Sequence, residues 1–172
     1  MTLEQPLATA PPQTLADAAE AHLDEVYGYL LYLTRDRETA EDLTGSTFEK
    51  ALRLWGRFDS ARGTARTWLL GIARTTALDW FRSESRRRKR EEAAARPERV
   101  DEAFLEGLSP ELEEALETLS AGEREVLALR IVLELDGDAT ARVLGISPTA
   151  CSTRLSRALE RLEERMKDAV AV

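Results

Sequence analysis

The stretch RGTARTWLLGIARTTALDWFRSESRRRKR, residues 62–90, decides how the rest of this chain is interpreted. It contains two of the three tryptophans. Its nine basic and two acidic side chains give it a net charge of +7, whereas the whole chain carries −8. A basic block inside an acidic protein is a candidate binding site for a polyanion.

Placed on a helix at about 100° per residue, this stretch has two different faces. The first is a broad apolar face: Leu69, Ile72, Ala73, Thr76, Ala77, Trp80 and Phe81. The second is polar, cationic and partly aromatic: Trp68, Arg74, Thr75, Leu78, Asp79 and Arg82. Such a face suits single-stranded nucleic acid, because bases stack on aromatic rings while arginines hold the phosphates. A solvated basic face, with Trp68 at the rim of the core, explains the pattern equally well.

Composition limits the other possibilities. A chain of 172 residues with 43% hydrophobic and 33% charged side chains forms one domain or two small ones with a core. No apolar run approaches the ~18 residues of a membrane span, and no secretory signal is present, so we expect no membrane insertion. One cysteine and one histidine exclude an internal disulfide framework and a Cys/His zinc site. We therefore expect no cofactor and a cytoplasmic location.

Helical spacing and capping residues predict an all-α protein. Residues 1–14 are rich in proline and lack periodicity, which predicts a disordered tail. Apolar spacing predicts helices over residues 15–33 and 36–55. A loop over residues 56–63 follows, and Thr64 is placed to cap the basic helix.

An acidic stretch divides the chain. Residues 91–108 contain a proline, many acids and few large apolar side chains, which predicts a linker and a domain boundary. Ser109-Pro110 and the capping box Ser120–Glu123 then open two further helices.

The C-terminal part predicts a helix-turn-helix. A turn over residues 135–138 and a short helix over 139–144 precede Gly-Ile-Ser, and Ser147-Pro148 opens the last helix. Polar side chains at the start of this helix occupy the positions where a recognition helix meets DNA, and three arginines lie on another face. Those arginines are Arg154, Arg157 and Arg161. A helical hairpin with a solvated arginine row and no DNA role is the alternative.

Three segments in this order resemble the small bacterial sigma factors of the extracytoplasmic-function (ECF) group. They are AEDLTGSTFEKAL (40–52), FDSARGTARTWLLGIARTTALDWFR (58–82) and LSAGEREVLALR…ARVLGISPTACSTRLSRALERL (119–162). The resemblance implies two small helical domains joined by a flexible linker. Residues 15–90 correspond to sigma region 2, and residues 109–168 correspond to the region 4 helix-turn-helix.

The resemblance implies a non-enzymatic transcription initiation factor whose partners are core RNA polymerase and promoter DNA. It also admits an anti-sigma factor as a partner. The resemblance implies that Asp42, Leu43, Phe48 and Glu49 dock on the β′ clamp helices of the polymerase. It also implies that region 4 contacts the β flap. The residues that it implies for melting and holding the −10 element are Arg66, Trp68, Arg74, Thr75, Asp79 and Arg82. The residues that it implies for reading the −35 duplex are Pro148, Thr149, Ser152, Thr153, Arg154 and Arg157.

The chain departs from the usual family residues at several of these positions. Gly45 and Ser46 stand in place of a glutamine and an acid, Thr75 in place of a common asparagine, and Ser152 in place of a lysine. Two alternatives remain open. One is a helix-turn-helix regulator of LuxR type, which leaves the tryptophan-containing basic helix unexplained. The other is a degenerate sigma-like protein that binds polymerase or another sigma factor but no promoter.

Overall fold

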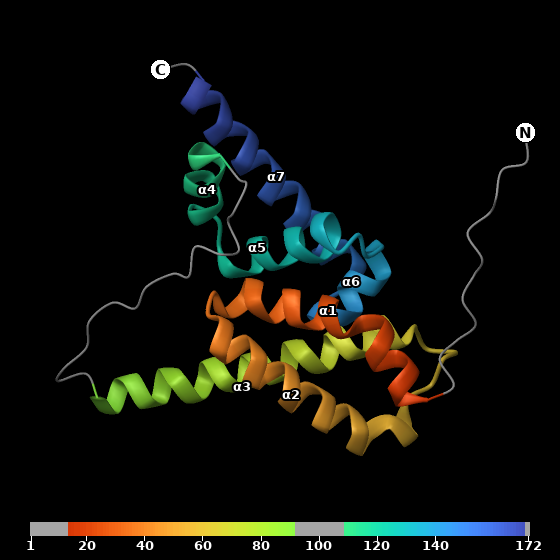
Figure 1. Ribbon diagram of the computed structural model, residues 1–172. Coiled ribbons are helices and arrows are strands. Elements are labelled where there is room, and N and C mark those ends of the chain that lie inside the picture. Colours follow the sequence, from red (N-terminus) through yellow and green to blue (C-terminus); the bar gives the residue numbers. More distant parts are fainter. Residues whose placement is uncertain (1–13, 92–108, 171–172) are drawn as a thin grey trace, which may run out of the picture.

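The structure is a computed structural model that describes residues 14–91 and 109–170. The predicted tail, apart from Thr14, and the predicted linker, apart from Glu91, lie outside the described residues. Every regular element of the described ranges is helical, which confirms the all-α prediction (Figure 1). None of the described helices has the length and apolarity needed to span a membrane.

The N-terminal part contains three long helices and one short turn: α1 (Leu15–Thr34), α2 (Arg37–Leu54), η1 (Trp55–Arg57) and α3 (Ala65–Glu91). Their starts are set by side chains that accept hydrogen bonds from otherwise unpaired backbone N–H groups. Thr14 and Asp17 form a capping box for α1, and Asp36 caps α2. The Thr64 hydroxyl accepts a hydrogen bond from the Thr67 N–H at 3.1 Å, which confirms the predicted cap of α3.

The described C-terminal part contains three short helices, a π-helical turn and one long helix: α4 (Pro110–Glu117), α5 (Ala121–Leu127), η3 (Ala128–Val132), α6 (Gly137–Leu144) and α7 (Pro148–Val170). Helix α6 begins two residues earlier than predicted, because the Asp136 carboxylate accepts from the Ala139 N–H at 2.7 Å and caps it. Gly145 ends α6 in the left-handed conformation, with φ of 65° and ψ of 34°. Glycine adopts this conformation without steric cost, so the turn of the helix-turn-helix forms here.

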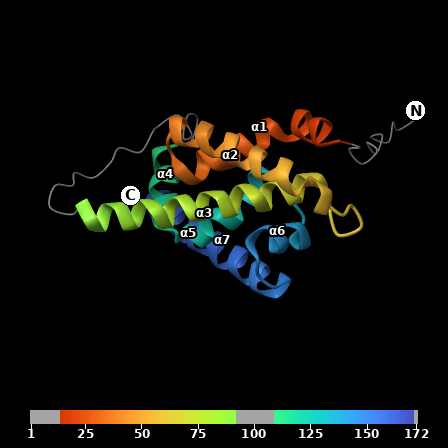
Figure 2. The same ribbon diagram turned by 90° about the horizontal axis from the view of Figure 1, so that it is seen from below.

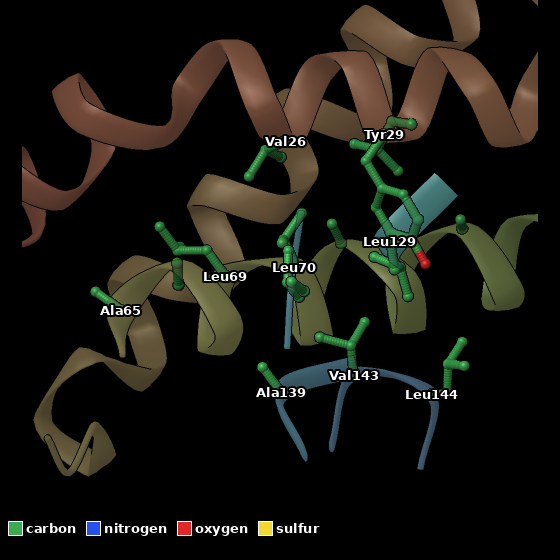
Figure 3. Close-up of a cluster of buried hydrophobic side chains, with 14 of the residues drawn as sticks. Val26, Tyr29, Ala65, Leu69, Leu70, Leu129, Ala139, Val143 and Leu144 are labelled. Carbon is green, nitrogen blue, oxygen red and sulfur yellow. The ribbon is translucent and has the colours of Figure 1, made fainter. Parts of the chain in front are cut away.

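One buried core joins the two parts of the chain. Helix α3 packs against α1 and α2 and also against α6. Leu69 and Leu70 of α3 lie between Val26 of α1 and the α6 side chains Val143 and Leu144 (Figure 3). A smaller core cluster involves Leu119, Leu127 and Ala158. The structure is therefore closed, with α3 as the element that both parts share.

Candidate nucleic-acid interface

Helix α3 presents different side chains to the C-terminal part and to solvent. The sequence analysis placed Arg74 on the same face as Thr75, Asp79 and Arg82, and this grouping is wrong. Arg66 and Arg74 point toward the C-terminal part, where both find oxygen partners. Thr75, Asp79 and Arg82 are exposed. The reason is that Arg74 lies at the edge of the apolar face, where Glu125 of α5 pairs with it.

Glu125 of α5 is the partner of Arg74. The Arg74 Nε donates to Glu125 Oε1 at 2.8 Å, and the Tyr29 hydroxyl of α1 donates to the same oxygen at 2.7 Å. The side chains of Arg74 and Glu125 are only 21% and 10% exposed. Burial, together with the Glu125 carboxylate, raises the pKa of Tyr29 well above its usual value. The phenol therefore stays protonated and keeps donating at neutral pH.

Two further hydrogen bonds close the same interface. Arg66 pairs with Glu25 of α1 and also donates to the Leu133 carbonyl of the C-terminal part. The Tyr32 hydroxyl donates to the Arg124 carbonyl at 2.7 Å, and burial raises the pKa of Tyr32 to about 12. Tyr29, Tyr32, Arg66 and Arg74 of the N-terminal part thus all donate hydrogen bonds to the C-terminal part.

An aromatic pocket lies at the N-terminal end of α3. The Trp68 ring packs against Trp55 and Phe58, with centroid distances of 5.7 Å and 5.4 Å. Trp68 also lines a pocket of ≈ 330 Å³ together with Phe58, Thr75 and Arg142 of α6. A pocket with aromatic walls and nearby guanidinium groups is suited to a planar ring that carries a phosphate.

The exposed face continues from this pocket along α3. Asp79 pairs with Lys50 of α2 at 3.6 Å and with Arg82 at 3.3 Å. The Thr75 hydroxyl donates to the carbonyls of its own helix, Gly71 at 2.6 Å and Ile72 at 3.1 Å. Thr75 and Asp79 are thus held against neighbouring groups, and the Arg82 side chain, 68% exposed against 59% for Asp79, is the more exposed of the two charges.

The start of α7 is open to solvent. Pro148, Thr149, Ser152 and Thr153 are all exposed, and the Ser147 hydroxyl caps the helix by accepting from the Ala150 N–H at 3.1 Å. Ser156 extends this row of hydroxyl groups by one turn and was not among the predicted site residues. Its spacing of three and four residues from Thr153 and Ser152 was the signal that could have identified it.

The three arginines of α7 have separate environments. Arg154 is half-buried and packs over the start of α5, where a Cβ built on Gly122 would lie 3.3 Å from its Nη1. Arg161 pairs with Glu123 at 3.0 Å. Arg157 is exposed. Arg157 follows Ser156 directly and lies beside the open hydroxyl face, and its charge, after the Ser120 hydrogen bonds and Arg161, helps to lower the pKa of Glu123 on α5.

Helix α2 carries the predicted polymerase contacts on two faces. Asp42 and Glu49 are exposed, Phe48 is half-buried, and Leu43 is only 6% exposed within the core. Leu43 therefore packs in the core and anchors α2 there, so its side chain is not on the exposed face of α2. Leu52 is 70% exposed and lies on the same side as Asp42 and Glu49. It was missed, although its position off the apolar stripe of α2 was visible in the sequence.

These features define an all-helical DNA-binding protein whose C-terminal part is a helix-turn-helix. The family model "Sigma-70 region 2" matches residues 18–87, and "Sigma-70, region 4" matches residues 109–162. The ECF RNA polymerase sigma factor SigC of Mycobacterium tuberculosis is 35% identical over 147 residues, which cover 83% of this chain and 78% of SigC. SigX of Bacillus subtilis is 26% identical, covering 86% and 81% of the two chains.

A solved structure agrees in fold. The sigma factor RpoE of Bartonella quintana, in complex with the anti-sigma factor NepR, superposes with a TM-score of 0.72 at 23% identity over 88% of this chain and 96% of RpoE. The chain belongs to the ECF RNA polymerase sigma factors. It directs promoter-specific transcription initiation and is a non-enzymatic partner of RNA polymerase. The LuxR-type interpretation is wrong, because the tryptophan-containing helix belongs to sigma region 2.

Proposed function

We propose that the exposed face of α3 melts the −10 element and holds its non-template strand. The observation that carries this proposal is the aromatic pocket of Trp68, Phe58 and Thr75 at the N-terminal end of the helix. An unpaired base can stack there, which is worth ~1–3 kcal/mol per base. Arg82 lies farther along the exposed side of the same helix, where it can hold an adjoining phosphate.

The start of α7 reads the −35 duplex in this proposal. Thr149, Ser152 and Thr153 present hydroxyl groups that both donate and accept hydrogen bonds, and Arg157 stands beside them. Arg154 packs on α5, so it positions α7 rather than reading a base in this conformation. The exposed stripe of α2 that contains Asp42, Glu49 and Leu52 is the surface proposed to dock on the polymerase clamp helices.

The closed structure has to open for both elements to be bound together. The names of the −10 and −35 elements place them about 25 base pairs apart, which is about 85 Å of B-DNA at 3.4 Å per base pair. Helix α3, at 27 residues, is about 40 Å long, and α6 packs against it. Promoter binding thus competes with the contacts of Glu125 and Leu133 that hold the two regions together.

An anti-sigma factor is the further partner that we propose. The contact between the regions leaves an apolar groove of ≈ 280 Å³ between α1 and η3, lined by Gly28, Tyr32, Val132 and Leu133 among others. Val132 is 63% exposed at its edge. A helix with apolar side chains could bind there and stabilise the closed form.

Promoter opening by reconstituted holoenzyme tests the main proposal. A fluorescent base analogue in the −10 element reports melting. Trp68→Ala should lower the open fraction by about 5- to 150-fold, the equivalent of one stacked base. Thr75→Ala tests the pocket without removing core volume, and Ser83→Ala is the control on an exposed residue of α3 outside the pocket. Equal opening by all four proteins, with circular dichroism unchanged, would show that this face does not melt DNA.

A further inference from the structure

Both regions of the chain line the pocket beside Trp68. Most of its walls come from η1, the loop that follows it and the first turns of α3, but Arg142 comes from α6 of region 4. Figures 1 and 2 show α6 beside the N-terminal half of α3 in both views, and the two helices pack together. The complete pocket therefore exists only while the two regions are closed on each other. The proposed stacking of a promoter base uses Trp68, Phe58 and Thr75 and leaves Arg142 without a role.

Positive charge surrounds this pocket. Arg57, Arg62 and Arg142 are all exposed, and their guanidinium groups have no hydrogen bond or ion pair with any residue that the structure describes. Asp59 is the one acid among the described residues of the lining, so the lining has a net charge of +2 in a chain whose net charge is −8. An excess of guanidinium groups around a concave site attracts an anionic ligand, and the fork of an arginine matches the oxygens of a phosphate group.

Two glycines leave room inside the pocket. A Cβ built on Gly63 would lie 3.8 Å from the Arg142 Nε, so the α6 guanidinium lies close to the backbone of the loop. A Cβ built on Gly71 of α3 would meet no atom within 4 Å. The cavity of ≈ 330 Å³ is at the small end of the range of about 300–1,000 Å³ that small-molecule sites occupy. Its size therefore suits a single nucleotide.

The aromatic wall of the pocket suits a planar base. The rings of Phe58 and Trp68 lie 5.4 Å apart at an angle of 52°, and both side chains are half-buried, so part of each ring is open to a ligand. Any base can stack on such a wall, because every base has a π face. The Asp59 carboxylate accepts from the Ala61 N–H at 2.9 Å through one oxygen, and its other oxygen can accept from the hydroxyl group of a sugar. Base, sugar and phosphate thus each find a suitable group in one cavity.

We propose that this pocket binds a free nucleoside 5′-phosphate in the closed chain, with the base on Phe58 and Trp68 and the phosphates on Arg62 and Arg142. A ligand that needs Arg142 binds the closed form and stabilises it through its higher affinity for that form. The nucleotide therefore competes with assembly on a promoter, which separates the two regions. The proposal shares an aromatic wall with the proposed function of α3 but goes beyond it, because the chain binds the nucleotide without polymerase or DNA.

Calorimetric titration of the full chain, without polymerase, tests this inference. The probes are ADP and GDP, and adenosine, guanosine and pyrophosphate represent their separate halves. At least one nucleotide should bind about 10-fold or more tightly than either of its halves, because base and phosphate contacts both contribute. Arg142→Gln should weaken this binding by about 10-fold or more, which corresponds to the loss of one hydrogen bond to a charged group. Gly71→Leu should also weaken it, because the new side chain fills the cavity from another wall without a change of charge.

A control and three outcomes make the test decisive. Arg165→Gln removes an exposed cation of α7 that does not line the pocket, and it should bind nucleotide as wild type does, with circular dichroism unchanged in all variants. Failure of both nucleotides to bind would overturn the proposal, and so would wild-type affinity in either Arg142→Gln or Gly71→Leu. Pyrophosphate that binds as tightly as the nucleotides would overturn it too, because the base would then contribute nothing. Promoter opening is measured on holoenzyme without added nucleotide, so this proposal and the proposed function can fail independently.

Discussion

Replacement of Glu125 by glutamine should open the closed structure. The Glu125 carboxylate accepts hydrogen bonds from Tyr29 of α1 at 2.7 Å and from Arg74 of α3 at 2.8 Å. Glutamine preserves the volume but leaves the Arg74 charge without its partner. Breaking a buried pair costs about 3–5 kcal/mol, and we discount this to about 2–4 kcal/mol because the Arg74 side chain is 21% exposed. An effect of that size changes the ratio of closed to open chains by about 30- to 1000-fold.

Two measurements on the isolated chain check this expectation. Small-angle X-ray scattering should give a larger radius of gyration for Glu125→Gln than for wild type, and urea denaturation should give the lower free energy of unfolding. The control is Glu163→Gln, because Glu163 pairs with Lys167 at 2.6 Å on the open surface of α7 and should contribute little. A double-mutant cycle with Arg74→Gln should be non-additive. Additive effects, or a wild-type radius of gyration for Glu125→Gln, would refute the role of this pair in closure.

Three other predictions concern stability and accessibility. Gly45→Ala should raise the free energy of unfolding by about 0.5–1 kcal/mol, because alanine favours the helix and a Cβ at this position meets no atom within 4 Å; a lower urea midpoint would contradict it. Burial raises the pKa of Tyr29 well above its usual value and that of Tyr32 to about 12, so the folded chain keeps protons that the unfolded chain loses near pH 10. The free energy of unfolding should therefore fall as pH rises from 10 toward 12, and tyrosinate absorbance should appear at lower pH in urea than in buffer. Cys151 is 2% exposed and burial raises the pKa of its thiol, so a thiol reagent should react much faster after unfolding than before; a fast native reaction would show that α7 is not packed as described.

Local signals in the sequence predicted the helices well. Thr64 and Ser120 cap helices because each places an oxygen next to free backbone N–H groups, and these signals need only four consecutive residues. Gly145 ended α6 for a similarly local reason. The start of α6 was wrong by two residues, since Asp136 was not recognised as its cap.

The arrangement of the two regions could not be predicted from the same patterns. Tyr29 and Glu125 are separated by 96 residues, and Arg74 and Glu125 by 51. Periodicity assigns Arg74 to a polar face, but it does not show that a carboxylate from another helix covers that face. The exposure of Leu52, unlike the partner of Arg74, could have been predicted, because Leu52 lies outside the apolar stripe of α2.

The burial of the Arg74–Glu125 pair couples the state of the chain to ionic strength. Dissolved ions screen a buried pair much less than they screen contacts between exposed cations and DNA phosphates. A bacterium that accumulates salt during osmotic stress would therefore weaken the promoter-bound form more than the closed form. A fall in intracellular salt would favour the promoter-bound form over the closed form, without any change in the amount of protein.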